Sequence, residues 1–106
     1  MMLLTKGTRS KLPKLGETDG QGGDATAHLK LFTPDSCWTW YATEFDGEDQ
    51  FFGLGSGLET ELGYFSLKEI EDYRSPAGLK VERDKYWRPK ILKEIPECPN
   101  WMKGNL

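Results

Sequence analysis

The segment from Phe51 to Tyr73 constrains the fold of this chain more than any other part. It is typical of a strand, a glycine-rich turn, a second strand and then a helix. Ser66 is a good N-cap residue, and Glu69 follows three positions later, which completes a Ser-x-x-Glu capping box. Phe65 precedes the cap and can pack against Ile70. We therefore expect a helix to begin directly after Ser66, at the end of a strand.

Length and charge restrict the classes of protein that this chain can represent. A chain of 106 residues corresponds to one domain, 1–106, with a modest core. Its net charge is only -3, although the last third is locally basic and the stretch from Glu44 to Asp72 is acidic. Cys37 and Cys98 are too few for a disulfide framework or a four-thiolate metal site, so we expect a cytoplasmic protein. The short apolar start predicts no membrane span and no secretory signal.

The first third of the chain predicts a weak helix and a loop. Thr5 can cap a helix from Lys6 to Leu12, which Gly7 weakens and Pro13 ends. Residues 16–27 are glycine-rich, small and acidic with nothing to bury, so we expect a flexible connecting loop there.

A hairpin is predicted next, and its second strand is rich in aromatic residues. His28–Phe32 and Cys37–Phe45 read as strands that flank a proline turn. Alternation places large rings on both sides of the second strand, with one face formed by Trp38, Trp40, Ala42 and Glu44 and the other by Thr39, Tyr41, Thr43 and Phe45. A strand of this kind is expected at the centre of a sheet that is covered on both faces.

The rest of the chain extends this sheet as a meander. After a turn at Asp46–Asp49 we expect a strand over Gln50–Leu54, a break or bulge at Gly55–Gly57 and a return strand over Glu61–Phe65. The predicted further elements are the helix from about Leu67 to Tyr73, a strand over Leu79–Asp84, an edge strand or short helix around Ile91 to Ile95, and an irregular tail from about residue 96 in which Trp101 could serve as an anchor. The fold class is therefore α+β, an antiparallel sheet of four to six strands packed by one firm helix and one weak N-terminal helix.

A succession of short motifs resembles a known family. The motifs are Leu3-Leu-Thr-Lys6, Lys30-Leu-Phe-Thr-Pro34, Thr39-Trp-Tyr-Ala-Thr-Glu44, Phe52-Gly53, Glu61-Leu-Gly-Tyr-Phe-Ser-Leu67 and Gly78-Leu-Lys-Val-Glu-Arg-Asp84. Their order and spacing resemble the domain of unknown function 2958 family, small proteins found mostly in plasmids, phages and other mobile elements. Gly7 departs from the helix that the family usually continues there. The resemblance implies no catalytic residues.

Carboxylates are the residues that an enzyme on this scaffold would use. Glu44, Glu61 and Glu82 each lie at or near a predicted strand, where they could converge on a metal ion. Glu82, Arg83 and Asp84 would then supply a catalytic group and a cation for phosphate. The simpler interpretation is a solvated edge strand whose acids pair with nearby lysines. The glycine run Gly53-Leu-Gly-Ser-Gly57 lacks the Gly-Lys-Ser/Thr ending of a phosphate-binding loop. His28 has no cysteine near it in sequence that could form a zinc site or a nucleophile pair with it.

Aromatic residues favour binding over catalysis, because four tryptophans exceed what so small a core needs. Tyr86 and Trp87 lie among cations where no core periodicity buries them. Exposed rings among cations can stack on nucleic-acid bases or anchor a protein interface, and the acidic total charge favours the interface. The candidate binding residues are Trp40, Glu44, Glu61, Tyr86, Trp87 and Arg88.

These patterns lead to a binding protein as the expected function. We expect a non-enzymatic accessory protein of a mobile element that needs no cofactor and binds another protein. A sharper version has an acidic band imitate a DNA backbone toward a host defence protein, with the band formed by Glu44, Asp46, Glu48, Asp49, Glu59 and Glu61. The alternative is a metal-dependent enzyme acting on nucleic acid, with the carboxylates above as ligands. The sequence does not indicate the oligomeric state.

Overall fold

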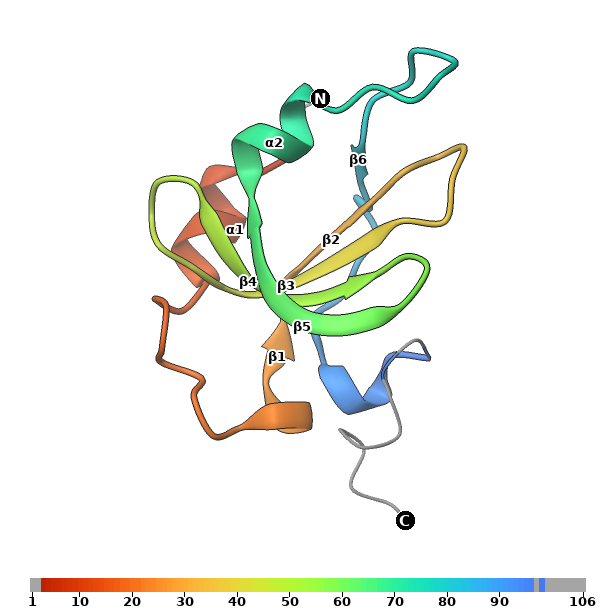
Figure 1. The fold of residues 1–106 in the computed structure, drawn as a ribbon. Helices are drawn as coiled ribbons and strands as arrows, with labels where there is room; N and C mark the ends of the chain where they lie inside the picture. Colours follow the sequence, from red (N-terminus) through yellow and green to blue (C-terminus); the bar gives the residue numbers. More distant parts are fainter. Residues whose placement is uncertain (1–2, 97, 99–106) are drawn as a thin grey trace.

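A five-stranded antiparallel sheet in the order β5-β4-β3-β2-β6 forms the centre of the molecule (Figure 1). The computed structural model describes residues 3–96 and Cys98. The strands of this sheet are β2 Leu29–Phe32, β3 Thr39–Phe45, β4 Gln50–Ser56, β5 Thr60–Ser66 and β6 Glu82–Arg83. Strands β2 to β5 form the predicted meander, and β6 returns to pair with β2. The expected strand over Leu79–Asp84 is shorter than predicted, since only its last part reaches β2.

Two helices lie on one side of this sheet, and a small second sheet lies on the other (Figure 1). The helices are α1 Lys6–Lys11 and α2 Leu67–Asp72. The second sheet pairs β1 Thr26–Ala27 with β7 Lys90–Ile91, each next to a turn of 3-10 helix, η1 Gly22–Asp24 and η2 Leu92–Glu94. The α+β class and the meander-like sheet are therefore confirmed.

Side chains on the two faces of the sheet build two hydrophobic clusters. The cluster under the helices contains Leu3, Leu4, Leu12, Leu29, Leu31, Ala42, Phe45, Phe51, Leu67, Ile70 and Val81. The cluster on the opposite face contains Ala25, Ala27, Tyr41, Leu54, Leu92, Ile95 and Cys98. Strand β3 contributes to both clusters, which confirms the prediction of a central strand covered on both sides.

A β-bulge in β3 changes which residues share a face. Ala42 pairs with Gly53 but Glu44 pairs with Phe52, so Thr43 is the extra residue. The strict alternation predicted for this strand is therefore wrong beyond Ala42: Phe45 joins Ala42 under the helices, whereas Glu44 moves to the opposite face. The predicted break at Gly55–Gly57 is also wrong, because β4 continues in register to Ser56.

Ser66 caps the start of α2 as predicted, and Asp49 is an additional partner of this cap. The Ser66 hydroxyl accepts a hydrogen bond from the Glu69 N–H at 3.2 Å, which makes Ser66 the N-cap. Asp49 lies across from this cap, and its carboxylate accepts from the Ser66 hydroxyl at 2.6 Å and from the Lys68 N–H at 2.8 Å. The turn between β3 and β4 therefore holds the first turn of α2.

The segment expected to be an unburied loop, residues 16–27, instead packs against the sheet. It contains η1 and β1, and it buries Gly23, Ala25 and Ala27. The N–H groups of Gly16 and Thr18 also bind a side chain of β3. Small residues can enter a core without an apolar pattern, which is why the sequence did not predict this burial. The tail prediction beyond Cys98, with Trp101, lies outside the described residues.

Candidate functional site

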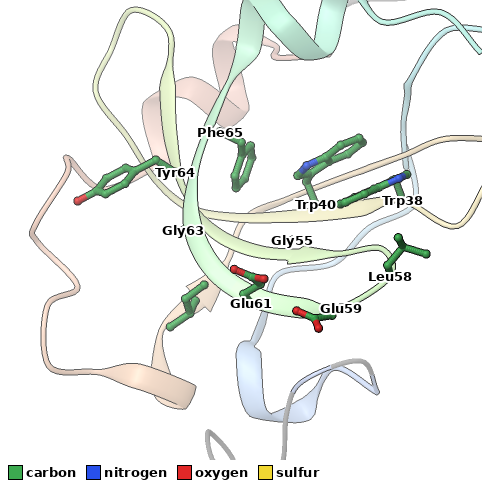
Figure 2. A pocket seen from close by; sticks show the side chains of 10 residues that line it. Trp38, Trp40, Gly55, Leu58, Glu59, Glu61, Gly63, Tyr64 and Phe65 are labelled. Carbon is green, nitrogen blue, oxygen red and sulfur yellow. The ribbon is translucent and has the colours of Figure 1, made fainter.

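A groove lined by aromatic residues opens on the helix side of the sheet, beside β5. Trp38 and Trp40 stack with ring centroids 6.0 Å apart and an interplanar angle of 16°. Figure 2 shows the two rings on the same side of the sheet as Phe65. The cavity has a volume of about 480 Å³ and is lined by Trp38, Trp40, Gly55, Leu58, Glu59, Glu61, Leu62, Gly63, Tyr64 and Phe65. We refer to this cavity as the aromatic groove.

Glycines leave the floor of the aromatic groove open. Across neighbouring strands, Trp40 pairs with Gly55 and Gly55 pairs with Glu61, so these side chains share one face with no side chain between them. In the next row, Gly53 pairs with Gly63. A Cβ at Gly63 would have no heavy atom within 4 Å, which shows that the space above it is empty. The register thus leaves an open slot over Gly63, next to Glu61, whereas a Cβ at Gly55 would already lie 3.7 Å from the Trp40 ring.

Gly57, unlike Gly63, has no free space beside it, because the Trp38 ring packs against it. A Cβ at Gly57 would lie 2.5 Å from atoms of the Trp38 ring, so only glycine lets this ring lie against the end of β4. Trp38 nevertheless remains 40% exposed, which leaves part of its ring available to a ligand. Gly57 therefore serves to position an aromatic ring.

The rim of the aromatic groove is acidic. Glu59 lies in the turn between β4 and β5, Glu61 follows on β5, and both are exposed. The Phe65 ring closes the other end and packs against Phe51, with centroids 5.3 Å apart. Two indole faces and two carboxylates around an open floor suit a ligand with an apolar stem and a cationic head.

Comparison with known proteins identifies the family of the chain. The model of a family described as a protein of unknown function, DUF2958, matches residues 3–93. The chain belongs to the DUF2958 family. A search of curated proteins and a search of solved structures each returned no match. Within the described part of this DUF2958 protein, no helix is long and apolar enough to cross a membrane.

Glu44 holds the segment that precedes β1 and does not line the aromatic groove. Its side chain is 2% exposed, and its carboxylate accepts from the Gly16 N–H at 2.9 Å, from the Thr18 N–H at 2.8 Å and from the Thr18 hydroxyl. Burial alone would raise the pKa of Glu44, but the hydrogen bonds from Thr18 and Gly16 outweigh it and lower the pKa below its usual value. The carboxylate is thus ionised and engaged by the chain itself.

The three carboxylates expected as metal ligands are not brought together. Glu61 lies on β5 and Glu82 on β6, which are the two outer strands on opposite edges of the sheet, and Glu44 is engaged by the segment before β1. Over residues 3–96 and Cys98, no group of three His, Cys, Asp or Glu side chains could hold a metal ion. His28 sits elsewhere, and burial together with the Lys11 charge lowers its pKa.

Glu82, Arg83 and Asp84 do line a common hollow of about 540 Å³, together with the exposed Tyr86. Asp84 has a structural partner there, since its carboxylate accepts from the Tyr86 N–H at 2.9 Å. Its other oxygen lies 3.8 Å from the Lys30 ammonium group. The hollow therefore carries charges of both signs rather than converging acids.

Trp87 is packed into the fold, which corrects its prediction as an exposed ring. Its indole N–H donates to the Ala27 carbonyl at 3.0 Å, and its ring lies 5.3 Å from that of Tyr41. The expected cations are present, because the Lys30 and Lys90 ammonium groups lie 5.7 Å and 5.1 Å from its centroid. Arg88 next to it is exposed, as is Tyr86.

The predicted acidic band does not form one surface. Asp46 and Asp49 precede β4 and Glu59 follows it, so they lie at opposite ends of a seven-residue strand, about 20 Å apart. Asp46 accepts from three backbone N–H groups in its own turn, which lower its pKa. The acids of Glu59 and Glu61 belong to the β5 edge, whereas Arg83 and Lys85 lie at or next to β6 on the other edge.

Of the predicted binding residues, Trp40 and Glu61 line the aromatic groove, whereas other lining residues were not predicted. The sequence pattern does not single out Trp38, Phe65 or Gly63 for binding. A usable signal was the repetition of glycine at alternate positions, at Gly53 and Gly55 of β4 and at Gly57 directly after it, in a segment that follows a Trp-x-Trp motif. Small residues facing large rings on one side of a sheet indicate a hollow.

Proposed function

We propose that this protein is a non-enzymatic binding module that holds an extended segment of another protein, carrying a lysine or arginine side chain, in the aromatic groove. The observation that supports it most is the open slot over Gly63, beside Glu61 and in the same groove as Trp40. A basic side chain could lay its methylene groups over Gly55 and Gly63 and direct its charged head to Glu61. As the family resemblance implied, we further propose that the module serves a mobile genetic element inside the cell.

The chemistry of the slot selects a basic partner over the other classes. An exposed cation against an indole face contributes about 0.5 to 1 kcal/mol, and an exposed ion pair contributes a similar amount. Phosphate groups would be repelled by Glu59 and Glu61, which disfavours nucleic acid at this site. One basic side chain alone therefore gives weak binding, and the segment must make further contacts.

A displayed library of random octapeptides tests this proposal. The immobilised full-length protein should enrich peptides that contain lysine or arginine among β-branched or aromatic residues. Gly63→Val is the informative variant, because a Cβ at this position would have no heavy atom within 4 Å and the valine methyl groups would occupy the slot. It should keep the thermal unfolding midpoint and lose the enrichment.

The control for this selection is Tyr86→Ala, which removes an exposed ring from the other hollow. This variant should select the same peptides as the unchanged protein. If the unchanged protein enriches basic peptides no more than the Gly63→Val variant does, the proposed function would be contradicted. Loss of enrichment in Tyr86→Ala instead would assign binding to the hollow beside β6.

A further inference from the structure

Strand β5 is the outer strand of the sheet on the side of the aromatic groove. It pairs with β4 without interruption, from Gln50 opposite Ser66 to Ser56 opposite Thr60. Among residues 3–96 and Cys98, no strand pairs with its other side. In an antiparallel edge strand, alternate residues direct both their N–H and their C=O away from the sheet. The backbone of β5 therefore presents a row of groups that another strand can bind.

The two edges of the sheet differ in how they are protected from such pairing. Strand β6, at the far edge, is only two residues long, and short edge strands offer little to pair with. Strand β5 is seven residues long, contains no lysine or proline and carries one charge, at Glu61. Natural proteins usually interrupt long edges with such residues or with bulges. The accessible edge is the one that borders the aromatic groove.

A strand added to β5 would send side chains into the aromatic groove at a defined spacing. Residues directly opposite each other point to the same face of a sheet, and the neighbouring residues point to the other face. The residue opposite Gly63 would therefore project over the empty slot, between the Glu61 carboxylate and the Phe65 ring. No other position along β5 offers space without a side chain. This position is where a long basic side chain fits.

We infer that the bound segment adds to β5 as a sixth strand, with a lysine or arginine side chain opposite Gly63. This inference rests on the proposed function and specifies its binding mode. Main-chain hydrogen bonds to β5 would supply the contacts that one basic side chain lacks, and the slot would supply the sequence preference. A second copy of this chain suits the edge less well, since its own β5 would bring carboxylates of the same sign to the acidic rim.

The probe for this binding mode is the heptapeptide acetyl-Thr-Val-Thr-Arg-Thr-Val-Thr-amide, titrated into the full-length protein by calorimetry and NMR. Its arginine and valines share one face, and its threonines share the other. Two methylated forms are compared with it, one N-methylated at both valines and one at the two inner threonines. Because the N–H groups of alternate residues point to opposite edges of a strand, only one of these two forms can still pair with β5.

We expect one methylated form to weaken binding by at least about tenfold and the other to bind within about twofold of the parent peptide. The outward N–H groups of residues 60–66 should become protected from hydrogen exchange when the parent peptide binds. Replacing the arginine of the peptide by norleucine should weaken its binding to the unchanged protein. The same replacement should have little effect on binding to the Glu61→Gln variant.

The outcomes separate this inference from the proposed function. Equal affinity of both methylated forms, with the preference for arginine retained, would overturn strand addition and leave the groove as a binding site for side chains. If the parent peptide does not bind although the protein still enriches basic octapeptides, the placement of an arginine opposite Gly63 in an added strand would be wrong. Failure of the octapeptide selection itself would remove the proposed function. A dimer in sedimentation that protects the outward N–H groups of residues 60–66 without the peptide would overturn the inference and assign the β5 edge to a second copy.

Discussion

Glu44 is the buried charge whose role in stability is defined best by its contacts. Its carboxylate accepts hydrogen bonds from Gly16 and Thr18, and these bonds are stronger to an ionised group than to a neutral amide. We expect Glu44→Gln to lower the free energy of unfolding at pH 7 by about 1 to 2 kcal/mol, measured by urea denaturation. Glu48→Gln, in the exposed turn before β4, should change it by less than about 0.5 kcal/mol.

The pH dependence of this effect follows from the lowered pKa of Glu44. A carboxyl group whose pKa is lower in the folded state stabilises the fold fully above its unfolded pKa, here 4.5. That stabilisation is lost as the pH falls from 4.5 through the folded pKa. The difference between the unchanged protein and Glu44→Gln should therefore shrink in acid, and a difference that stays constant down to pH 2 would contradict this account.

Two glycines that face each other in the sheet predict opposite effects of one methyl group. A Cβ at Gly53 would lie 1.9 Å from the Tyr41 carbonyl oxygen, beside the bulge, whereas a Cβ at Gly63 would meet nothing. We expect Gly53→Ala to lower the free energy of unfolding by at least about 3 kcal/mol and Gly63→Ala to change it by less than about 1 kcal/mol. Similar values for both variants would show that β3 can move away from β4 at the bulge.

The junction between β5 and α2 shows how an element depends on residues distant in sequence. Asp49 binds the Ser66 hydroxyl and the Lys68 N–H, and its own carbonyl accepts from the Leu67 N–H at 2.8 Å. We expect Asp49→Ala to lower the free energy of unfolding by about 1 to 2 kcal/mol, and Glu69→Ala by less than about 0.5 kcal/mol. Asp49 and Ser66 act together, so the double variant Asp49→Ala, Ser66→Ala should lower the free energy of unfolding by less than the sum of the two single variants. Additive losses would show that the two residues cap α2 independently.

The elements that the sequence predicted well are those determined by local chemistry. The cap at Ser66, the turn at Asp46–Asp49 and the strand alternation up to Ala42 all depend on residues within a few positions of each other. The bulge at Thr43 depends on how β3 meets β4, so alternation within β3 could not reveal it. The aromatic groove was missed for the same reason, because the empty space over Gly63 is created only when three strands align.

The distribution of charge over the whole molecule also required the sheet order. A chain with a net charge of -3 gives no strong overall field, but the topology places Glu61 on one outer strand and Glu82 on the other. The β5 edge thus carries the acids Glu59 and Glu61, whereas the β6 edge carries charges of both signs, with Glu82 and Asp84 beside Arg83 and Lys85. Local charge near the aromatic groove, rather than net charge, is what a basic peptide would encounter.

Two charge reversals separate local from overall electrostatics in peptide binding. Glu61→Lys and Glu82→Lys each change the net charge from -3 to -1, since each replaces one negative charge by one positive charge. For the arginine heptapeptide we expect Glu61→Lys to raise the dissociation constant by at least about tenfold and Glu82→Lys by less than about twofold, measured by calorimetry. The Debye length falls from about 10 Å at 0.1 M salt to about 3 Å at 1 M, so added salt should reduce the difference between the variants. Equal weakening by both reversals would mean that the peptide responds to the charge of the whole molecule and not to the acidic rim beside Gly63.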